Sequence, residues 1–588
     1  MITMKKIIYL ITLLFLLSSC EDFLSFEPLT DKTSANFPST EEEVKQMMAG
    51  IYTTMNNESQ QTDMSYFFVN EVASDEKLGG GGVNDKKAQA YEAFMYSDPE
   101  MLGHNWETTY EGIHRANFAI EKLTEVSEQE NSFLSSGQND QYRGEAYFLR
   151  AFFYYRLATL YGSVPLKITT ELADLGGATP DEIFAQIATD LKTAIELLPS
   201  TSYSNTEEGH VTKWAAQAMM ARVWLFYTGF YQKADLPLTE GGSVSKSDVV
   251  SWLTDCVNNS GHQLVGDFHE LWPYTNSLTI GDYDYIQDYM AETGKELKYA
   301  SDNGARNPET LFALKFNNFA GWGVDRGYGN MYQLFFALRG LQNVADTYPF
   351  AGGWGQGNSI PKQMVDEWQA DEPGDIRIGA SVLVIDEELP KYKIGQWDFV
   401  MESNWWGKKY NGIATRVPDG DEFKYHNDYS VIMYGNQDNN QLSHADDLIF
   451  IRFADVLLML SELTEDAQYM NRVRARAGLD PKPYSVENLR KERRYELAFE
   501  GLRWNDMRRY GPEYAKAALE KQNGAPILNY GAPKTYTSLN PKGYSARYDE
   551  TKGFFPIPQS QINLSNGLLE QIEGYKEGQG GLYPGWSN

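Results

Sequence analysis

The chain has 588 residues, a formal net charge of −30 and only two cysteines, Cys20 and Cys256. Its length is enough for one large domain or for two to three ordinary ones. A chain this acidic gains nothing from displacing the counterions of nucleic acid, so nucleic acid is excluded as a partner, and two cysteines provide no disulfide framework.

The N-terminus has the features of an export signal. Lys5 and Lys6 precede an apolar run over residues 7–17, which is shorter than the roughly 20 residues that cross a bilayer. Two serines then precede Cys20, an order that resembles the bacterial lipobox. The resemblance implies that residues 1–19 are a signal peptide and that Cys20 is a lipid anchor.

Residues 20–40 show no periodicity and are predicted to be a lipidated tether. The acids Glu21 and Asp22 resemble the surface-export signal of certain Gram-negative lipoproteins, so we expect an outer-membrane protein that faces the cell exterior. Several acyl chains hold a protein durably where one chain binds only marginally. The alternative for Cys20 is a buried thiol or a disulfide bond, for which Cys256 is the one possible partner within the chain.

Residues 41–231 read as helices joined by short loops. The segment 144–162 is apolar nearly all round and is predicted to be a buried helix. The next helix begins with a capping box, in which Thr179 caps and Glu182 reaches back. A third helix is expected to begin at Thr212.

The centres of these helices recur at a nearly constant interval. Phe148 and Phe184 are 36 residues apart, and Phe184 and Met219 are 35 apart, close to the period of about 34 of tetratricopeptide repeats. We therefore predict a mainly α fold, a tetratricopeptide-like array of helix hairpins that share one core.

The rest of the chain is less regular. Residues 232–445 are rich in Gly, Asn, Asp, Tyr and Trp, helices return over 446–511, and the tail 512–588 again reads as irregular. Long irregular stretches in a compact protein are usually functional loops, and the aromatic content argues against disorder. We expect a single domain over 41–588, with a large loop-rich region packed on the helical scaffold.

Seven blocks in order along the chain resemble the SusD/RagB family of nutrient-binding outer-membrane lipoproteins. They are NEVASDE (70–76), WETTYEGIHRANFAIE (106–121), GEAYFLRAFFYYRLATLYGSVPL (144–166), FIRFADVLLMLSEL (450–463), MNRVRARAGL (470–479), LRKERRYELAFEGLRWNDMRRYG (489–511) and GFFPIPQSQINLSNG (553–567). The sequence QIEGY at 571–575 departs from the Gln-Asn-Pro-Gly-Tyr-like turn of the family. The resemblance implies a surface protein that captures oligosaccharide and passes it to a SusC-like TonB-dependent transporter.

The charged block near the C-terminus is predicted to have a structural role. Glu492, Glu496 and Glu500 follow at four-residue steps, and Arg493 and Arg503 can pair with such acids or with neighbouring helices. The alternative, a catalytic acid pair, has no second orienting group. The sequence also has no zinc-protease, nucleophile-elbow or phosphate-loop motif, so we predict that the protein is not an enzyme.

Two glycine-rich aromatic clusters, at 317–332 and 348–361, are the candidate ligand platform. Trp and Tyr rings cover the apolar faces of sugars, while amide side chains bind the hydroxyl rim, and flanking glycines let the chain turn. The alternative is that Trp322 and Trp354 fill the core under the loops. The candidates in these clusters are Trp322, Tyr328, Trp354, Gln356 and Asn358.

The family resemblance adds a loop at 77–100, from which we take Asn84 and Tyr91 as ligand-binding candidates. Trp106 opens a helix in a family block and is expected to pack. Trp405 and Trp406 are adjacent, so on a strand at most one of them can face outward.

Two further segments have plain interpretations beside functional ones. The acidic segment PDGDEF at 418–423 could hold a calcium ion, but it lacks the full loop pattern and is favoured as a solvated turn. LGGGGVND at 78–85 is favoured as a loop tip, since it lacks the dinucleotide pattern. We therefore expect neither a cofactor nor a bound metal.

The competing functions differ in the ligand. A RagB-like lipoprotein of a similar transporter complex would capture peptides in a long polar groove, whereas a glycan-binding protein needs a rigid aromatic patch. A protein-binding scaffold is a third possibility, because tetratricopeptide arrays often bind other proteins.

Overall fold

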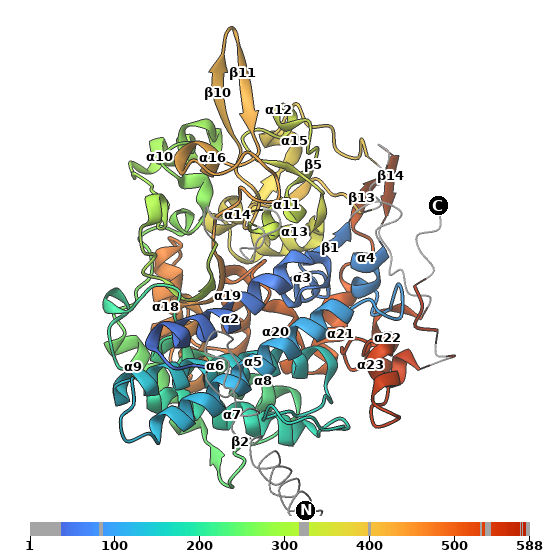
Figure 1. Ribbon diagram of the computed structural model, residues 1–588. Coiled ribbons are helices and arrows are strands. Elements are labelled where there is room, and N and C mark those ends of the chain that lie inside the picture. The colour runs from blue at the N-terminus through green and yellow to red at the C-terminus, as the bar shows by residue number, and fades with distance from the viewer. Residues whose placement is uncertain are drawn as a thin grey trace, which may run out of the picture.

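The computed structural model describes residues 37–80, 86–316, 321, 329–397, 401–529, 532–535, 542–576, 578 and 580–583. Long helices fill the lower half of the molecule in Figure 1, and short helices and small sheets fill the upper half. The predicted mainly α architecture, a tetratricopeptide-like array with a loop-rich region packed on it, is confirmed.

The array consists of long helices that each pack against the next in the chain. It comprises α2 (Glu41–Gln60), α5 (Gly103–Ser127), α6 (Ser136–Tyr161), α7 (Pro180–Leu197), α8 (Lys213–Phe230) and α9 (Lys246–Asn259). The shorter η1 (Thr62–Met64), α3 (Tyr66–Val72), β1 (Leu78–Gly80) and α4 (Lys86–Glu92) lie between α2 and α5 in the chain, and η2 (Tyr203–Asn205) lies between α7 and α8.

Local sequence signals fix the ends of these helices as predicted. The Oγ1 of Thr179 accepts a hydrogen bond from the backbone N of Glu182 at 3.3 Å, and the Glu182 carboxylate accepts one from the N of Thr179 at 2.8 Å. Thr212 caps α8. The helix α6 is buried nearly all round from Gly144 onward, because it lies between α5 and α7 in the array.

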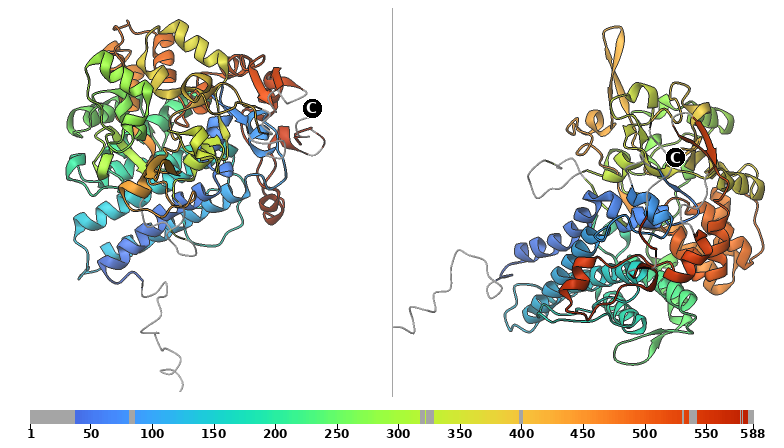
Figure 2. Two further views of the ribbon diagram at one scale, coloured as in Figure 1. Left: turned by 90° about the horizontal axis from the view of Figure 1, so that it is seen from above. Right: turned by 90° about the vertical axis from the view of Figure 1, so that its right-hand side faces the viewer.

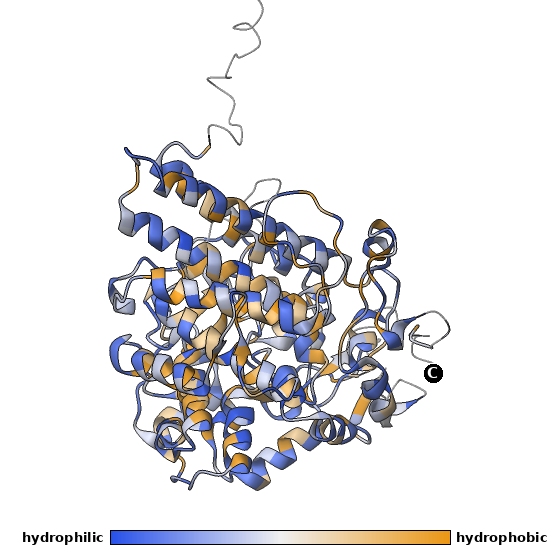
Figure 3. Ribbon diagram, turned by 90° about the horizontal axis from the view of Figure 1, so that it is seen from below, coloured by the Kyte–Doolittle hydropathy of each residue, from blue (hydrophilic) through white to orange (hydrophobic). Residues whose placement is uncertain are grey.

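The C-terminal helices complete the array although they are far away in sequence. The strand β12 (Leu448–Arg452) leads into α17 (Phe453–Thr464), α18 (Ala467–Arg476), α19 (Val486–Glu496) and α20 (Arg503–Arg509). The helix α17 packs on α9, and α20 packs on α8, so the orange and red helices lie beside the blue and green ones in Figure 2. A hydrophobic core runs through both groups, and stretches of hydrophobic colour run along the helices in the middle of Figure 3.

The charged block has the predicted structural role, because it ties the C-terminal helices to the loop-rich region. Glu496 at the end of α19 accepts hydrogen bonds from Arg377, Arg452 and Arg476, and all four side chains are buried. Burial alone would raise the pKa of Glu496, but the three guanidinium groups outweigh it and hold that pKa below its usual range. Because the network joins segments from residue 377 to residue 496, it has a packing role.

The upper half is built of short elements. Its helices are η3 (Phe268–Leu271), η4 (Pro273–Thr275), η5 (Ile280–Asp282), α10 (Asp284–Thr293), η6 (Asp302–Gly304), α11 (Met331–Phe336), α12 (Val344–Thr347), α13 (Lys362–Asp371), α14 (Ile376–Ser381), α15 (Ile385–Glu388) and α16 (Ser430–Met433). Its strands are β4 (Thr310–Leu314), β5 (Leu338–Arg339), β6 (Gly352–Gly353), β7 (Gln356–Ser359), β8 (Val382–Val384), β9 (Trp405–Gly407), β10 (Thr415–Asp419) and β11 (Glu422–His426). Outside the upper half, β2 (Leu236–Pro237) and β3 (Ser243–Val244) form a small hairpin, and β2 packs on α7 and α8.

The largest sheet has the strand order β1-β7-β9-β8, and the other described sheets are two-stranded. The strand β1 comes from the N-terminal part of the chain and the other three from the upper half. This sheet therefore ties the loop-rich region to the array.

The tail is more regular than predicted. It contains α21 (Pro512–Glu520), β13 (Pro526–Asn529), β14 (Ala532–Thr535), α22 (Gly543–Thr551), α23 (Gln559–Leu564) and η7 (Glu573–Tyr575). Pro512 stands at the first position of α21, a favoured place for proline, so the expectation of an irregular segment over 512–588 was wrong for these residues.

Candidate functional site

The strand pair β1–β7 brings together the segments that carry the predicted ligand loops. Leu78 pairs with Ser359 and Gly80 pairs with Gln356, while α11 packs on β6 and β7. The first predicted loop, 77–100, contains β1, and the first glycine cluster, 317–332, ends at the first two residues of α11. We call β1, β6, β7, α11 and Trp354 the loop junction.

Trp354 lies between β6 and β7 and is partly exposed. Its ring meets Phe335 of α11 edge to face, with centroids 4.7 Å apart, and its backbone N donates to the carbonyl of Leu334 at 2.9 Å. Arg339 donates to the Trp354 carbonyl at 3.3 Å. The backbone of Trp354 is therefore held by two hydrogen bonds and its ring packs on Phe335, while the residue stays partly exposed, a combination suited to stacking on a ligand.

The next two candidates, Gln356 and Asn358, both lie on β7 but differ in exposure. Gln356 is partly exposed, whereas Asn358 is fully buried. The Asn358 Nδ2 donates to the carbonyls of Phe336 at 2.8 Å and Gly407 at 2.9 Å. Asn358 therefore joins α11 to β9, and its assignment to the ligand platform is corrected to a packing role.

Tyr91 is also placed in the core. It lies in α4, is fully buried, and donates through its hydroxyl to the carbonyl of Met101 at 3.3 Å. Burial raises the pKa of its phenol well above the ordinary value. Its predicted ligand contact is corrected for the same reason as that of Asn358.

Four predicted residues lie outside the described residues. They are Cys20, Asn84, Trp322 and Tyr328. Cys256, the disulfide partner in the alternative interpretation of Cys20, is fully buried on α9. A bond between the two would require the N-terminal segment to enter the core.

The glycines of the second cluster serve close packing as well as turning. A Cβ on Gly353 would lie 2.3 Å from the carbonyl oxygen of Leu334, and one on Gly357 would lie 2.7 Å from the ring of Phe68. Gly357 also has a φ of 63°, which favours glycine. These positions let β6 and β7 approach α11 and α3 closely.

The other tryptophan expectations are confirmed. Trp405 is partly exposed on β9, whereas Trp406 is 1% exposed and its Nε1 donates to the carbonyl of Phe336 at 2.7 Å. Trp106 is buried and packs on Tyr161 of α6.

Sequence reasoning missed an aromatic cluster on the β10–β11 hairpin, which projects from the top of the molecule in Figure 1. The rings of Tyr348 and Tyr425 lie 5.3 Å apart. Arg416 lies over Tyr348 and over Phe423, which is 47% exposed, and it pairs with Asp282 at 2.9 Å. The available signal was the alternation of polar and apolar residues in TRVP and EFKYH on either side of the acidic turn. That turn is the tip of the hairpin.

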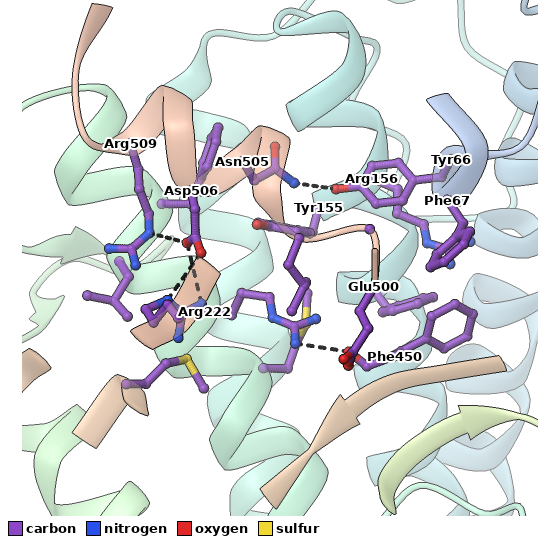
Figure 4. Close-up of a pocket in the computed structure, with 18 residues that line it drawn as sticks. Tyr66, Phe67, Tyr155, Arg156, Arg222, Phe450, Glu500, Asn505, Asp506 and Arg509 are labelled. Atoms are coloured by element: carbon purple, nitrogen blue, oxygen red, sulfur yellow. Dashed lines mark hydrogen bonds and ion pairs between the residues drawn. The ribbon is translucent and has the colours of Figure 1, made fainter. Parts of the chain in front are cut away.

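The described residues contain no cluster of His, Cys, Asp and Glu that could hold a metal ion. A cavity of about 50 Å³ lies between α6, α8 and α20, and Figure 4 shows it lined by Arg222, Asp506 and Arg509. Asn505 donates to the hydroxyl of Tyr66 there at 2.8 Å. This cavity has room for water-sized groups, not for a sugar ring.

Two family models match the chain. One, described as starch-binding associating with outer membrane, matches residues 22–225, and the SusD family model matches residues 282–575. No helix among the described residues is both long enough and apolar enough to cross a membrane.

Curated relatives match over almost the whole length. A SusD-like protein P2 from Formosa agariphila is 24% identical, over 97% of this chain and 100% of its own. A SusD-like protein from Bacteroides ovatus is 22% identical, over 96% of this chain and 97% of its own.

Solved structures have the same fold. The surface glycan-binding protein A from Bacteroides fluxus matches with a TM-score of 0.66 at 21% identity, over 92% of this chain and 100% of that chain. A structure titled laminarin binding SusD-like protein matches with a TM-score of 0.64 at 22% identity, over 91% of this chain and 100% of that chain. With a family model that covers half of its residues and the fold described above, the chain belongs to the SusD family.

Proposed function

We propose that this protein is a cell-surface lipoprotein that captures oligosaccharides and delivers them to a SusC-like TonB-dependent transporter. The observation that carries the proposal is Trp354, a partly exposed residue whose ring packs on Phe335, next to the partly exposed Gln356 at the loop junction. Similar solved structures include surface glycan-binding proteins, and one is in complex with laminarihexaose.

The chemistry of the loop junction suits a sugar. A sugar ring presents an apolar C–H face, against which an indole ring buries area at about 25 cal/mol per Å². Gln356 offers an amide donor and acceptor to the hydroxyl rim. In the sequence, Asn84 follows β1 by four residues, and Trp322 and Tyr328 precede α11 by nine and three residues. We propose that these three residues extend the same platform.

The anchor and the partner belong to the same proposal. Lipidation of Cys20 would hold the protein on the outer membrane, because several acyl chains anchor a protein durably. The description of the first matching family model, which names association with the outer membrane, supports this location.

The test is a binding screen with the folded chain. Laminarin oligosaccharides are the first probes, followed by other oligosaccharides of different linkage and then by a peptide library, each measured by calorimetry. The proposal predicts saturable binding to at least one oligosaccharide. Binding to peptides with no binding to any oligosaccharide would instead assign the RagB-like, peptide-capturing alternative.

A further inference from the structure

The most C-terminal of the described residues, 580–583, pair with the chain just after α4. The backbone N of Tyr96 donates to the carbonyl of Gly581, and the N of Tyr583 donates to the carbonyl of Tyr96, each at 2.8 Å. The two segments therefore run side by side as a short parallel bridge at Leu582. We call residues 580–583 the tail segment.

Tyr583 makes the contact between the tail segment and α4. It is 3% exposed, and its hydroxyl donates to the Oε1 of Gln89 on α4 at 2.8 Å. Burial raises the pKa of the Tyr583 phenol, and the charge of the nearby Glu92 raises that pKa further. The phenol therefore keeps its proton and remains a donor, and it ties the tail segment to a residue 494 positions earlier in the chain.

The other end of the Gln89 amide reaches the loop junction. Its Nε2 donates to the carbonyl of Gly80 on β1 at 3.4 Å, and Gln89 is fully buried. On the same helix, Glu92 accepts a hydrogen bond from the N of Gly79 at 2.9 Å. A Cβ on Gly79 would lie 2.8 Å from the carbonyl oxygen of Ala88, so β1 packs directly on α4, as the two labels in Figure 1 show.

Gly80 in turn lies against the strand that carries the candidate ligand residues. It pairs with Gln356, and a Cβ on Gly80 would lie 3.3 Å from the N of Gly357 and 3.5 Å from the carbonyl oxygen of Gly355. The φ angles of Gly355 and Gly357 are 67° and 63°, a region that glycine enters freely. Because a glycine on each side of Gln356 leaves the backbone many alternatives, its course depends on the neighbours that hold it, and Gly80 is one of them.

The helix α4 also has anchors of its own. Tyr91 is fully buried, and its ring meets Phe555 edge to face with centroids 5.7 Å apart. Phe94, just after the helix, stacks on Trp504 with centroids 5.1 Å apart. Loss of one hydroxyl in the tail segment should therefore leave α4 in place and change only the orientation of the Gln89 amide.

We propose that the tail segment positions the ligand-binding edge of the loop junction. Tyr583 orients the Gln89 amide, that amide holds Gly80, and Gly80 holds the backbone of Gln356. Tyr583 and Gln89 are positioning residues, because both are buried and act through β1. This inference rests on the proposed function, which assigns Gln356 and Trp354 to the ligand.

The test measures oligosaccharide affinity of the full chain by calorimetry, with laminarihexaose or with the first oligosaccharide of the screen that binds. Tyr583→Phe removes the hydroxyl and keeps the ring, and it should weaken binding roughly three-fold to ten-fold, the range that one hydrogen bond accounts for. Gln89→Met should weaken binding to the same extent. The double variant should bind no more weakly than either single variant, because both changes remove the same contact.

The matched control is Tyr575→Phe. Tyr575 is also buried near the C-terminal end, but its hydroxyl donates to the carbonyl of Phe554 at 3.1 Å, outside α4 and the loop junction. The two tyrosine variants should have similar melting temperatures, because each loses one hydrogen bond, while the control keeps the affinity of wild type. Without ligand, hydrogen exchange of the amides at 78–80 and 356–359 should be faster in Tyr583→Phe than in the control.

The outcomes separate the two proposals. If Tyr583→Phe binds as tightly as wild type, or if the control weakens binding as much, the positioning inference is overturned and the proposed function stands. Full additivity of Tyr583→Phe and Gln89→Met also overturns the inference, because the two residues then do not act through one contact. If wild type binds no oligosaccharide, the proposed function falls and hydrogen exchange decides: unchanged exchange in Tyr583→Phe overturns the positioning, and faster exchange at both strands supports it.

Discussion

Replacing Glu496 by Gln tests the ion network that joins the C-terminal helices to the rest of the fold. The Glu496 carboxylate is fully buried, and it accepts from Arg377 at 3.0 Å and also from Arg452 and Arg476. Glutamine removes the charge that compensates these guanidinium groups, but it keeps the volume. Breaking a buried pair from one side typically costs about 3–5 kcal/mol, because the remaining charge stays buried.

The assay is urea unfolding followed by circular dichroism, with Asp366→Asn as the control. Asp366 pairs with Lys362 on α13, and the two side chains are 54% and 41% exposed. A pair of this kind contributes about 0.3–0.5 kcal/mol. We expect Glu496→Gln to lower the free energy of unfolding by several times more than the control does. Equal effects of the two variants would refute the packing role of the network.

Three further predictions concern the anchor, the corrected site and pH. Cys20→Ala should abolish labelling by a palmitate analogue, and unchanged labelling would disprove the anchor. Asn358→Ala should destabilise the fold by about 1–3 kcal/mol, because two buried carbonyls lose their donor. The affinity of the folded protein for oligosaccharide should stay the same. Weakened affinity with unchanged stability would return Asn358 to the platform. Burial raises the pKa of Glu402 to about 7, although Tyr392 and the N of Gly395 donate to it. Above the unfolded pKa of about 4.3, the Glu402 carboxyl keeps its proton in the folded state but loses it in the unfolded state. This contribution to the free energy of unfolding is therefore lost as the pH rises through 7. Glu402→Gln should flatten the decline in stability between pH 5 and 8.5 by up to about 3 kcal/mol, and an unchanged pH profile would contradict that origin.

The array was predictable because its signals are local. The capping box of Thr179 and Glu182 and the apolar run of α6 act within one or two helical turns. The family blocks then extended the prediction to the C-terminal helices. The tail was misjudged because α21 to α23 are short and have a weak apolar period, although Pro512 signalled the start of one of them.

The candidate site was predictable only in part, because long-range pairing decides which side chains face outward. Nothing local in the sequence shows that β1 pairs with β7, almost 280 residues later. That pairing leaves Gln356 partly exposed, while the strand alternation and the packing of α11 bury Asn358. Tyr91 was chosen from the family resemblance alone, and burial in α4 was not visible from its neighbours.

The most direct test of the central claim is oligosaccharide affinity in tryptophan variants. Trp354→Ala and Trp322→Ala should each weaken binding by roughly ten-fold to a hundred-fold, because a stacked aromatic contributes about 0.5–1.5 kcal/mol beyond its buried area. The matched control is Trp406→Ala on neighbouring β9, a fully packed residue whose loss should cost about 3–5 kcal/mol of stability. Calorimetry and melting temperature together separate the two behaviours. If both platform variants bind an oligosaccharide as tightly as wild type does, ligand capture at the loop junction is contradicted.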